Sequence, residues 1–342
     1  MHKNNPTKRR VTQGDVAKKA NVSQAMVSYI VNDNKSVTIP DETRQRVLDV
    51  MDELGYFPNI TARRLRSSKT YTIAGIIPDI TNPFYPAFER GIQDVANRHN
   101  YDLVMYNTDG TLEREQKCLR SMLQGRVDGI VSVFFHIHAK QLIPLIDQGL
   151  SIVRLEGIPK NIGKLPIDNI YIDNISASQS AVDYLIERGH SRIGMLTSDE
   201  GPARFREIGY RKALDTHGIT YAKELLSSGE YSEGGGYQAM IRLLSLDNPP
   251  SAVFAANDLM AMGAMVAIRE ANLHIPNDVA IIGFDDIPTA KLVYPALTTV
   301  AQFQRNLGQR AAEMLMERLN GNGPEHGRSF EMPYEIIIRD TV

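Results

Sequence analysis

Three short clusters contain side chains that could do chemistry. Asp285 and Asp286 are adjacent carboxylates, but neighbouring positions diverge on the backbone and no nucleophile motif accompanies them, so they do not form a catalytic pair. His136 and His138 lack a third ligand, which favours solvated or effector-lining histidines over a metal site. The glycine run 234–236 lacks the rest of a phosphate-loop motif and is typical of an ordinary turn. We therefore expect no enzyme, no metal and no cofactor.

The composition is that of a folded protein of two or three domains. The chain has 342 residues, of which 42% are hydrophobic and 23% are charged. Its one cysteine, Cys118, cannot form an intramolecular disulfide, which fits a reducing cytoplasm. No run approaches the roughly 18 apolar residues of a spanning helix, and the basic start MHKNNPTKRR leads into no apolar segment. We therefore expect a cytoplasmic protein without a membrane partner.

Charge is divided unevenly along the chain. Residues 1–70 hold 13 Lys and Arg against 7 Asp and Glu, whereas the remaining 272 residues hold 25 against 33. A basic segment on an otherwise acidic chain indicates nucleic-acid binding, although a solvated surface can have the same composition.

Three predicted helices open this basic segment. We expect them at about residues 13–20 and 24–31, and from the Thr38-Ile-Pro-Asp41 start to Gly55. Two short helices across a three-residue turn, supported by a third, form a helix-turn-helix whose second helix enters the DNA major groove. The alternative is a three-helix packing module that binds no DNA.

The start of the second helix is suited to a phosphate group. Ser23 caps it without an acidic residue in the first turn, whereas the other two starts carry Asp15, opposite Thr12 in a capping box, and Asp41. The positive end of the second helix dipole is therefore left free. The side chains expected to face outward from this helix are Gln24, Ala25, Ser28, Tyr29 and Asn32.

A short arginine-rich segment follows at residues 58–70. Asn59 can cap a helix of about two turns, which is too short to be stable without a partner. Arg63, Arg64, Arg66 and Lys69 can neutralise phosphates. Leu65 has no obvious core to enter, so we predict that it is a wedge in the minor groove.

From Tyr71 onward, strand-like and helix-like patterns alternate. Apolar runs lie at 73–77, 102–106, 128–134, 151–155, 192–197, 251–255 and 279–284. Amphipathic stretches of helical length lie near 86–99, 113–124, 175–188, 205–217, 235–246 and 258–271. The pattern predicts parallel sheets covered on both faces, and the length favours two subdomains with a ligand cleft between them.

An ordered series of motifs extends over the whole chain. The N-terminal ones are Thr12, Asp15 to Ala17, Ala20, Val22-Ser23, Val27-Ser28, Asn32, Gly55-Tyr56, Pro58-Asn59 and Ala62 to Arg66. The later ones are Asp79 to Tyr85, Val127 to Gly129, Gly189-His190, Arg206 to Tyr210, Ala256 to Asp258, Ile282 to Asp286 and Pro295 to Thr299. Together these motifs resemble the LacI/GalR family of bacterial transcriptional regulators.

The resemblance implies an α/β protein with a three-helix helix-turn-helix head, a hinge helix and a two-subdomain core like the periplasmic binding proteins. We expect the head at 1–57, the hinge at 58–70 and the core at 71–342. The implied N-subdomain comprises about 71–167 and 297–322, and the C-subdomain about 168–296 and 323–342, with three crossovers between them.

The resemblance also implies a ligand-responsive, sequence-specific repressor of carbohydrate or nucleoside utilisation genes. Its partners would be a pseudo-palindromic double-stranded DNA operator, a second copy of itself, and a sugar, sugar phosphate or nucleoside that alters operator affinity through the hinge. The implied location is the bacterial cytoplasm, on the nucleoid when DNA is bound. A transport-type sugar-binding protein would have a similar core, but the basic head and the missing export signal argue against that alternative.

Candidate DNA-binding residues combine the helix pattern with the resemblance. They are Thr12, Ser23, Gln24, Ala25, Ser28, Tyr29, Asn32, Asn59, Ala62, Arg63, Leu65 and Arg66. Met26 and Tyr29 stand where the family most often has Thr and Arg, so the common operator cannot be assumed. A tyrosine suits contact with a thymine methyl or a single hydrogen bond, and a phosphate contact is the alternative.

Candidate effector-binding residues lie in the implied cleft. The resemblance points to Asn82, Phe84, Tyr85, Arg206, Asn257, Asp285 and Gln302. Asn257 and Asp285 also follow apolar runs directly, at the carboxyl ends where open parallel sheets bind ligands. Glu156 follows the run at 151–155 and could also reach the cleft. The same holds for four residues at the end of the run at 128–134, namely Phe134, Phe135, His136 and His138.

The expected assembly is a dimer. A small head covers one half-site, so a pseudo-palindromic operator requires two heads. Residues 335–339 read as a final strand rather than a heptad-bearing helix, and we therefore expect no tetramer.

Overall fold

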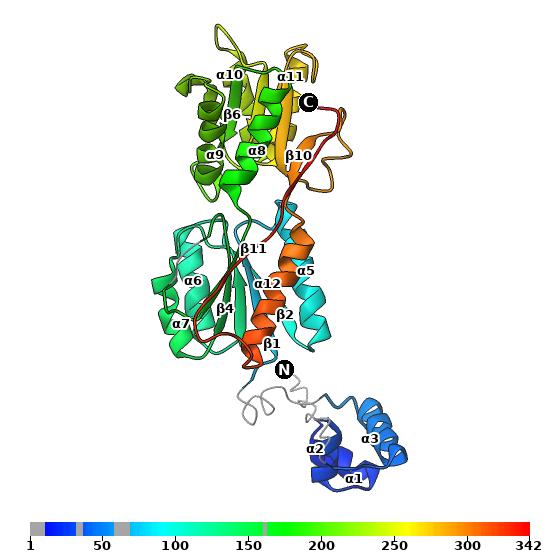
Figure 1. Ribbon diagram of the computed structural model, residues 1–342. Coiled ribbons are helices and arrows are strands. Elements are labelled where there is room, and N and C mark those ends of the chain that lie inside the picture. The colour runs from blue at the N-terminus through cyan, green and yellow to red at the C-terminus, as the bar shows by residue number, and fades with distance from the viewer. Residues whose placement is uncertain (1–10, 32–36, 58–68, 160–162) are drawn as a thin grey trace, which may run out of the picture. The chain divides into compact units, whose positions relative to one another are not determined.

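The computed structural model describes residues 11–31, 37–57, 69–159 and 163–342. It divides into two compact units, Met1–Lys69, here called the head, and Thr70–Val342, the core (Figure 1). Six of the predicted DNA contacts lie outside the described residues: Asn32, Asn59, Ala62, Arg63, Leu65 and Arg66.

Three helices form the described part of the head. They are α1 (Gln13–Ala20), α2 (Gln24–Val31) and α3 (Asp41–Leu54). The predicted capping box is present, since the Asp15 carboxylate accepts from the Thr12 amide at 2.9 Å and the Thr12 hydroxyl accepts from the Asp15 amide at 3.3 Å. α3 begins after Pro40 rather than at Thr38, because the residue before a proline is held in extended backbone.

A small apolar core holds the three helices of the head together. Val16, Val27 and Val47 contribute one fully buried side chain from each helix, and Ile30 and Tyr56 pack beside them. These residues follow helical spacing, so the polar positions of each helix face outward.

The core contains two sheets, each with helices on both faces (Figure 1). Each sheet with its covering helices is here called a lobe. The sheet of the first lobe has the order β11-β5-β4-β3-β1-β2 and is parallel throughout. Its strands are β1 (Thr72–Ile77), β2 (Asp102–Asn107), β3 (Gly129–Ser132), β4 (Ser151–Glu156), β5 (Ile167–Tyr171) and β11 (Ser329–Glu331). One face packs on α5 (Phe84–Arg98) and α12 (Gln304–Leu319), and the other on α6 (Leu112–Met122) and α7 (Ile143–Asp147), which follows the short helix η1 (Ala139–Leu142).

The sheet of the second lobe has the order β12-β10-β9-β8-β6-β7, with only β12 antiparallel to its neighbour. Its strands are β6 (Ile193–Thr197), β7 (Leu226–Ser228), β8 (Ala252–Ala255), β9 (Ala280–Asp285), β10 (Thr298–Ala301) and β12 (Glu335–Ile337). The covering helices are α8 (Asn174–Glu187) and α9 (Ala203–Thr216) on one face and α10 (Glu233–Leu244) and α11 (Asp258–Glu270) on the other. The short helix η2 (Lys223–Leu225) leads into β7.

The chain passes between the two sheets three times, after β5, β10 and β11. The subdomain boundaries expected from the sequence were wrong at each of these places. β5 belongs to the first lobe, although the second lobe was expected to begin at 168. β10 belongs to the second lobe, although residues 297–322 were assigned to the first. β11 lies in the first lobe, although residues 323–342 were assigned to the second. All three are short strands without a long apolar run, so the sequence pattern did not mark them.

One local expectation also changes. Glycines 234–236 lie inside the first turns of α10 rather than in a turn, because the Ser232 hydroxyl caps this helix by accepting from the Gly235 amide at 3.1 Å. Residues 335–337 do form the expected final strand. The described helices include none that is long and apolar enough to cross a membrane.

Candidate functional site

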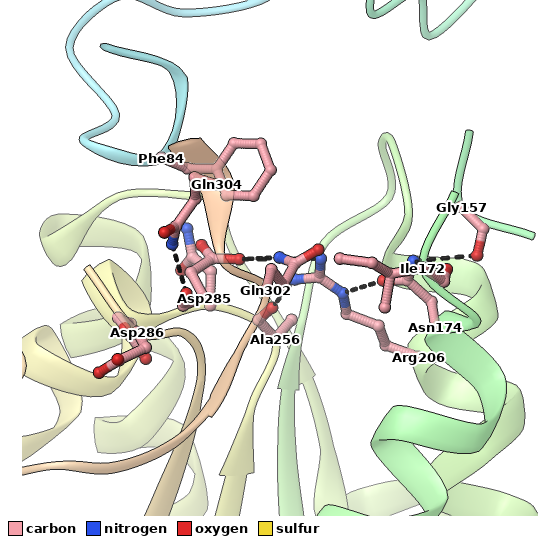
Figure 2. A network of polar contacts seen from close by, with 12 residues as sticks. Phe84, Gly157, Ile172, Asn174, Arg206, Ala256, Asp285, Asp286, Gln302 and Gln304 are labelled. Carbon is pink, nitrogen blue, oxygen red and sulfur yellow. Dashed lines mark hydrogen bonds and ion pairs between the residues drawn. The ribbon is translucent and has the colours of Figure 1, made fainter. Parts of the chain in front are cut away.

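The candidate effector site lies at the carboxyl edge of the second sheet. Asp285 ends β9, Asn257 follows β8, Gln302 follows β10 and Arg206 projects from α9. All four side chains are at least 95% buried. Figure 2 shows Arg206, Asp285 and Gln302 pointing toward one another.

Arg206 is the centre of this network. Its Nε donates to Asn174 Oδ1 at 2.8 Å, and its Nη1 donates to the carbonyl of Ala256 (Figure 2). Its Nη2 lies 3.9 Å from Asp285 Oδ1, and the guanidinium stacks over the Phe284 ring at 3.8 Å from the ring centre. These contacts fix the orientation of the guanidinium, so its remaining donors are presented in one geometry.

Asp285 is held from two directions. Gln302 Nε2 donates to Asp285 Oδ1 at 2.5 Å, and Gln304 Nε2 donates to the Asp285 main-chain oxygen (Figure 2). Burial raises the pKa of the Asp285 carboxyl, while the neighbouring Arg206 guanidinium lowers it. The backbone of Asp285 has a φ of 129°, a value that residues other than glycine rarely adopt. These contacts and this backbone conformation fix the position of the Asp285 carboxyl at the end of β9.

Asn257 contributes a buried amide donor. Its Oδ1 caps α11 by accepting from the Met260 amide at 2.9 Å. Its Nδ2 has no hydrogen-bond partner among the described residues, although the side chain is 99% buried. A buried unpaired donor costs about 1–3 kcal/mol, so a ligand oxygen at this position would be stabilising.

Aromatic side chains from the first lobe complete the site. Phe84 and Tyr85 open α5 with ring centres 5.1 Å apart, and the Asn82 carboxamide oxygen accepts from the Phe84 amide at 3.0 Å. Burial raises the pKa of the Tyr85 hydroxyl, with the charge of Asp285 as the next cause. Tyr85 is therefore close enough to interact electrostatically with the opposite lobe.

Tyr231 is a further candidate residue for the site, which the sequence interpretation did not name. It precedes α10, and burial raises the pKa of its hydroxyl, which also senses the charges of Arg206 and Asp285. The signal was weak because Tyr231 follows β7, a three-residue strand without an apolar run. An aromatic ring here and the Tyr85 ring can both pack on the apolar faces of a ring-shaped ligand.

Glu156 ends β4 of the first lobe and is paired there. Its Oε1 lies 2.8 Å from Arg154 Nη2, and the same Arg154 nitrogen donates to the Ile137 carbonyl at 2.9 Å. The Arg154 and Glu156 side chains are both buried. The negative charge of Glu156 is therefore balanced by Arg154 in its own lobe rather than by Arg206.

The segment after β3 has a structural role. Phe134 is buried in the core of the first lobe, and the Glu115 carboxylate accepts from the amides of residues 135–137. His136 Nε2 lies 2.8 Å from the Gly110 oxygen, and the His138 amide donates to Gln141 at 2.8 Å. Among the described residues there is no group of three side chains suited to a metal ion.

Phe135 links the two lobes. Its ring lies against Gly201, in the loop between β6 and α9, so closely that a Cβ there would come within 2.9 Å of it. A side chain larger than glycine at position 201 would separate the two surfaces.

On the head, the described DNA-contact candidates lie on the outside. Gln24, Ala25 and Tyr29 on α2 are exposed, and Ser28 is half-buried. Ser23 caps α2 through its hydroxyl, which accepts from the Met26 amide at 3.1 Å, and Thr12 caps α1. The structure thus presents one face of α2 to solvent.

Comparisons with known proteins match both units. The family model "Bacterial regulatory proteins, lacI family" matches residues 12–59, and the model "Periplasmic binding protein-like domain" matches residues 182–342. Catabolite control protein A of Priestia megaterium is 35% identical over 334 residues, covering 97% of this chain and 99% of that protein.

Solved structures are similar over almost the whole chain. A lac repressor dimer bound to operator and the anti-inducer ONPF aligns with a TM-score of 0.85 and 25% identity, over 97% of this chain and 99% of that one. A complex of the transcriptional regulator CelR with cellobiose aligns with a TM-score of 0.72 and 28% identity, over 97% of this chain and 100% of that one.

Proposed function

Since the chain belongs to the lacI family of bacterial regulatory proteins, we propose that it represses carbohydrate or nucleoside utilisation genes. We propose further that a hydroxyl-rich small molecule, bound around Arg206, lowers or raises the affinity of the protein for its operator. The family model matched to the head argues against a transport protein without a DNA role. The relatives named above are regulators, and we propose a purely regulatory role in the cytoplasm, on the nucleoid when DNA is bound.

The observation that carries the effector class is the buried polar network around Arg206, Asp285 and Asn257. Arg206 and Asp285 offer fixed donors and acceptors, and Asn257 Nδ2 is buried without a partner among the described residues. A site of this kind pairs hydroxyl groups, which both donate and accept, while Tyr85 and Tyr231 pack on the ring that carries them. The cellobiose bound by CelR supports the same class of ligand.

The network favours an uncharged ring over a sugar phosphate. The Arg206 guanidinium already faces Asp285 and donates to Asn174 and the Ala256 carbonyl. A phosphate would bring a charged group into a buried site whose guanidinium already has these partners, and burying an anion without a free cation is costly. We therefore propose a neutral sugar or nucleoside.

Ligand binding would be transmitted through the lobes. Tyr85 comes from the first lobe and Arg206 from the second, so a ligand between them favours one arrangement of the two lobes. The chain that leaves the hinge is anchored to the first lobe, because the Asp128 carboxylate accepts from the Thr70 amide at 2.6 Å and from the Tyr71 amide at 2.9 Å. A rotation of the first lobe would therefore move the end of the hinge.

We propose a homodimer as the DNA-binding form. β2 forms an edge of the first sheet, and its Val104 and Met105 side chains are 41% and 39% exposed. An exposed apolar edge strand is suited to pairing with a second copy. Two hinges side by side would then place both Leu65 side chains at a central base step, as the sequence suggests.

A ligand screen tests the proposal. Neutral sugars, sugar phosphates and nucleosides are added to the full chain and the melting temperature is measured. A specific ligand at 100 times its Kd stabilises the folded chain by about 2.7 kcal/mol. We expect a shift with a neutral sugar or nucleoside, and a shift produced only by phosphate esters would contradict the proposed class.

A further inference from the structure

The outer face of α2 carries no charge at all. None of its eight residues, Gln24–Val31, is acidic or basic. Val27 and Ile30 are buried against the other two helices, while Gln24, Ala25 and Tyr29 are exposed, the last by 37%. Ala25 and Tyr29 lie on one face because residues four apart are neighbours on a helix, and Gln24 stands at the edge of that face in the first turn.

This face is the part of the head that reaches base edges if the head docks as a helix-turn-helix. Ser23 caps the start of α2, and the first turn has no acidic residue, so a phosphate can approach the helix start. The inference below therefore rests on the DNA-binding role proposed above.

Two cations among the described head residues make contacts away from α2. Lys19 Nζ lies 2.5 Å from Glu53 Oε1, and Arg46 Nε donates to the Ala20 carbonyl at 3.1 Å. Both contacts join α1 or its end to α3, so these side chains hold the head together and do not replace the missing cations of α2.

The chemistry of the exposed face selects among base pairs. Guanine is read most often by the paired donors of Arg or by Lys on its O6 and N7, and α2 has neither residue. Glutamine makes a bidentate contact with adenine N6 and N7, and an alanine methyl or an aromatic ring packs on the thymine methyl. We infer that α2 reads A·T pairs, with Gln24 on an adenine and with Ala25 and Tyr29 on thymine methyl groups.

The first experiment removes the thymine methyl alone. Operator half-sites are selected from random duplexes with the full chain, and each thymine is then replaced by uracil, which keeps the base pair. We expect selected A·T pairs within the half-site and a several-fold loss of affinity at one or two thymines, with no loss at flanking thymines. Equal binding of all uracil duplexes, or selected G·C pairs at the positions that α2 reads, would overturn the inference.

The second experiment identifies the position that Gln24 reads. Gln24→Arg should change the preferred base at one position from adenine to guanine, by about ten-fold. Gln45→Arg is the matched control, because Gln45 is exposed on α3 and its replacement by arginine adds the same charge to the same head. The control should leave the base preference unchanged.

The outcomes separate this inference from the DNA-binding role. If no duplex is enriched, the DNA-binding role fails and the inference fails with it. If a site is enriched but Gln24→Arg and Gln45→Arg shift base preference equally, the DNA-binding role stands and the readout by α2 is refuted.

Discussion

Glu89 on α5 is a buried carboxyl, and it provides a quantitative test of the core. Its side chain is 97% buried, and neither carboxylate oxygen has a hydrogen-bond partner among the described residues. The carboxyl occupies the space above Gly75 on β1, where a Cβ would lie 2.3 Å from Glu89 Oε2. Burial raises the pKa of the Glu89 carboxyl from 4.5 to about 8.

The pH dependence follows from this raised pKa. Below pH 4.5 the carboxyl is protonated in both the folded and the unfolded chain, so it does not change their balance. Between pH 4.5 and about 8 the unfolded chain loses the proton and the folded chain retains it, so stability falls as pH rises. At 1.36 kcal/mol per pKa unit, the full loss is about 5 kcal/mol, of which about 3 kcal/mol is present at pH 7.

Glu89→Gln tests this account, because glutamine has the same shape and cannot ionise. Urea unfolding of the wild type and the variant is measured at pH 4.5, 6, 7 and 8.5. We expect the variant to gain stability relative to the wild type as pH rises, by about 3 kcal/mol between pH 4.5 and pH 7.

A matched control removes an exposed carboxyl. Glu187→Gln at the end of α8 changes the same group on the surface and should show no gain with pH. If the stability of Glu89→Gln follows that of the wild type at every pH, the carboxyl is not buried as described and the reasoning is refuted.

Three further predictions concern the site, the hinge and the assembly. Asn257→Ser keeps a residue that caps α11 but removes the amide donor that has no partner among the described residues. Calorimetry should therefore show about ten-fold weaker effector binding, with an unchanged melting temperature. An unchanged affinity for the effector would remove Asn257 from the site. Leu65→Ser should weaken specific operator binding and abolish the operator bend while leaving nonspecific binding and the melting temperature nearly intact, and a normal bend angle would contradict the wedge. Sedimentation should show a dimer at micromolar concentration, since residues 335–337 pair with β10 in the second sheet, and a stable tetramer would be inconsistent with this.

Regular elements with strong local signals could be predicted from the sequence. The capping box at Thr12 and the cap at Ser23 located α1 and α2, because a polar cap before an apolar stripe is sufficient to mark a helix start. Continuous apolar runs located the central strands of both sheets, since a strand buried on both faces has little freedom to vary.

The remaining strands depend on distant partners that a sequence pattern does not show. β5 contains Asp168 and Asn169, both fully buried, and polar residues break the apolar run that marks a strand. Asp168 is tolerated because Arg318 Nη2 on α12 donates to it at 2.6 Å, 150 residues later in the chain. No local rule predicts that pairing.

The same division applies to the candidate site. Asn257 and Asp285 were predicted to lie together because both end strands of one parallel sheet. The contacts that orient Arg206, from Asn174 and the Ala256 carbonyl, required the structure, since a buried arginine can satisfy its donors in many ways.

The central claim is that an effector bound around Arg206 and Asp285 controls operator affinity. The most direct measurement is the anisotropy of a labelled operator titrated with wild type, Arg206→Ala and Asp285→Ala, each with and without the ligand found by thermal shift. All three proteins should bind the operator equally without ligand, which also shows that the variants are folded, and only the wild type should change its affinity when the ligand is added. A full response to the ligand in both variants would contradict the claim.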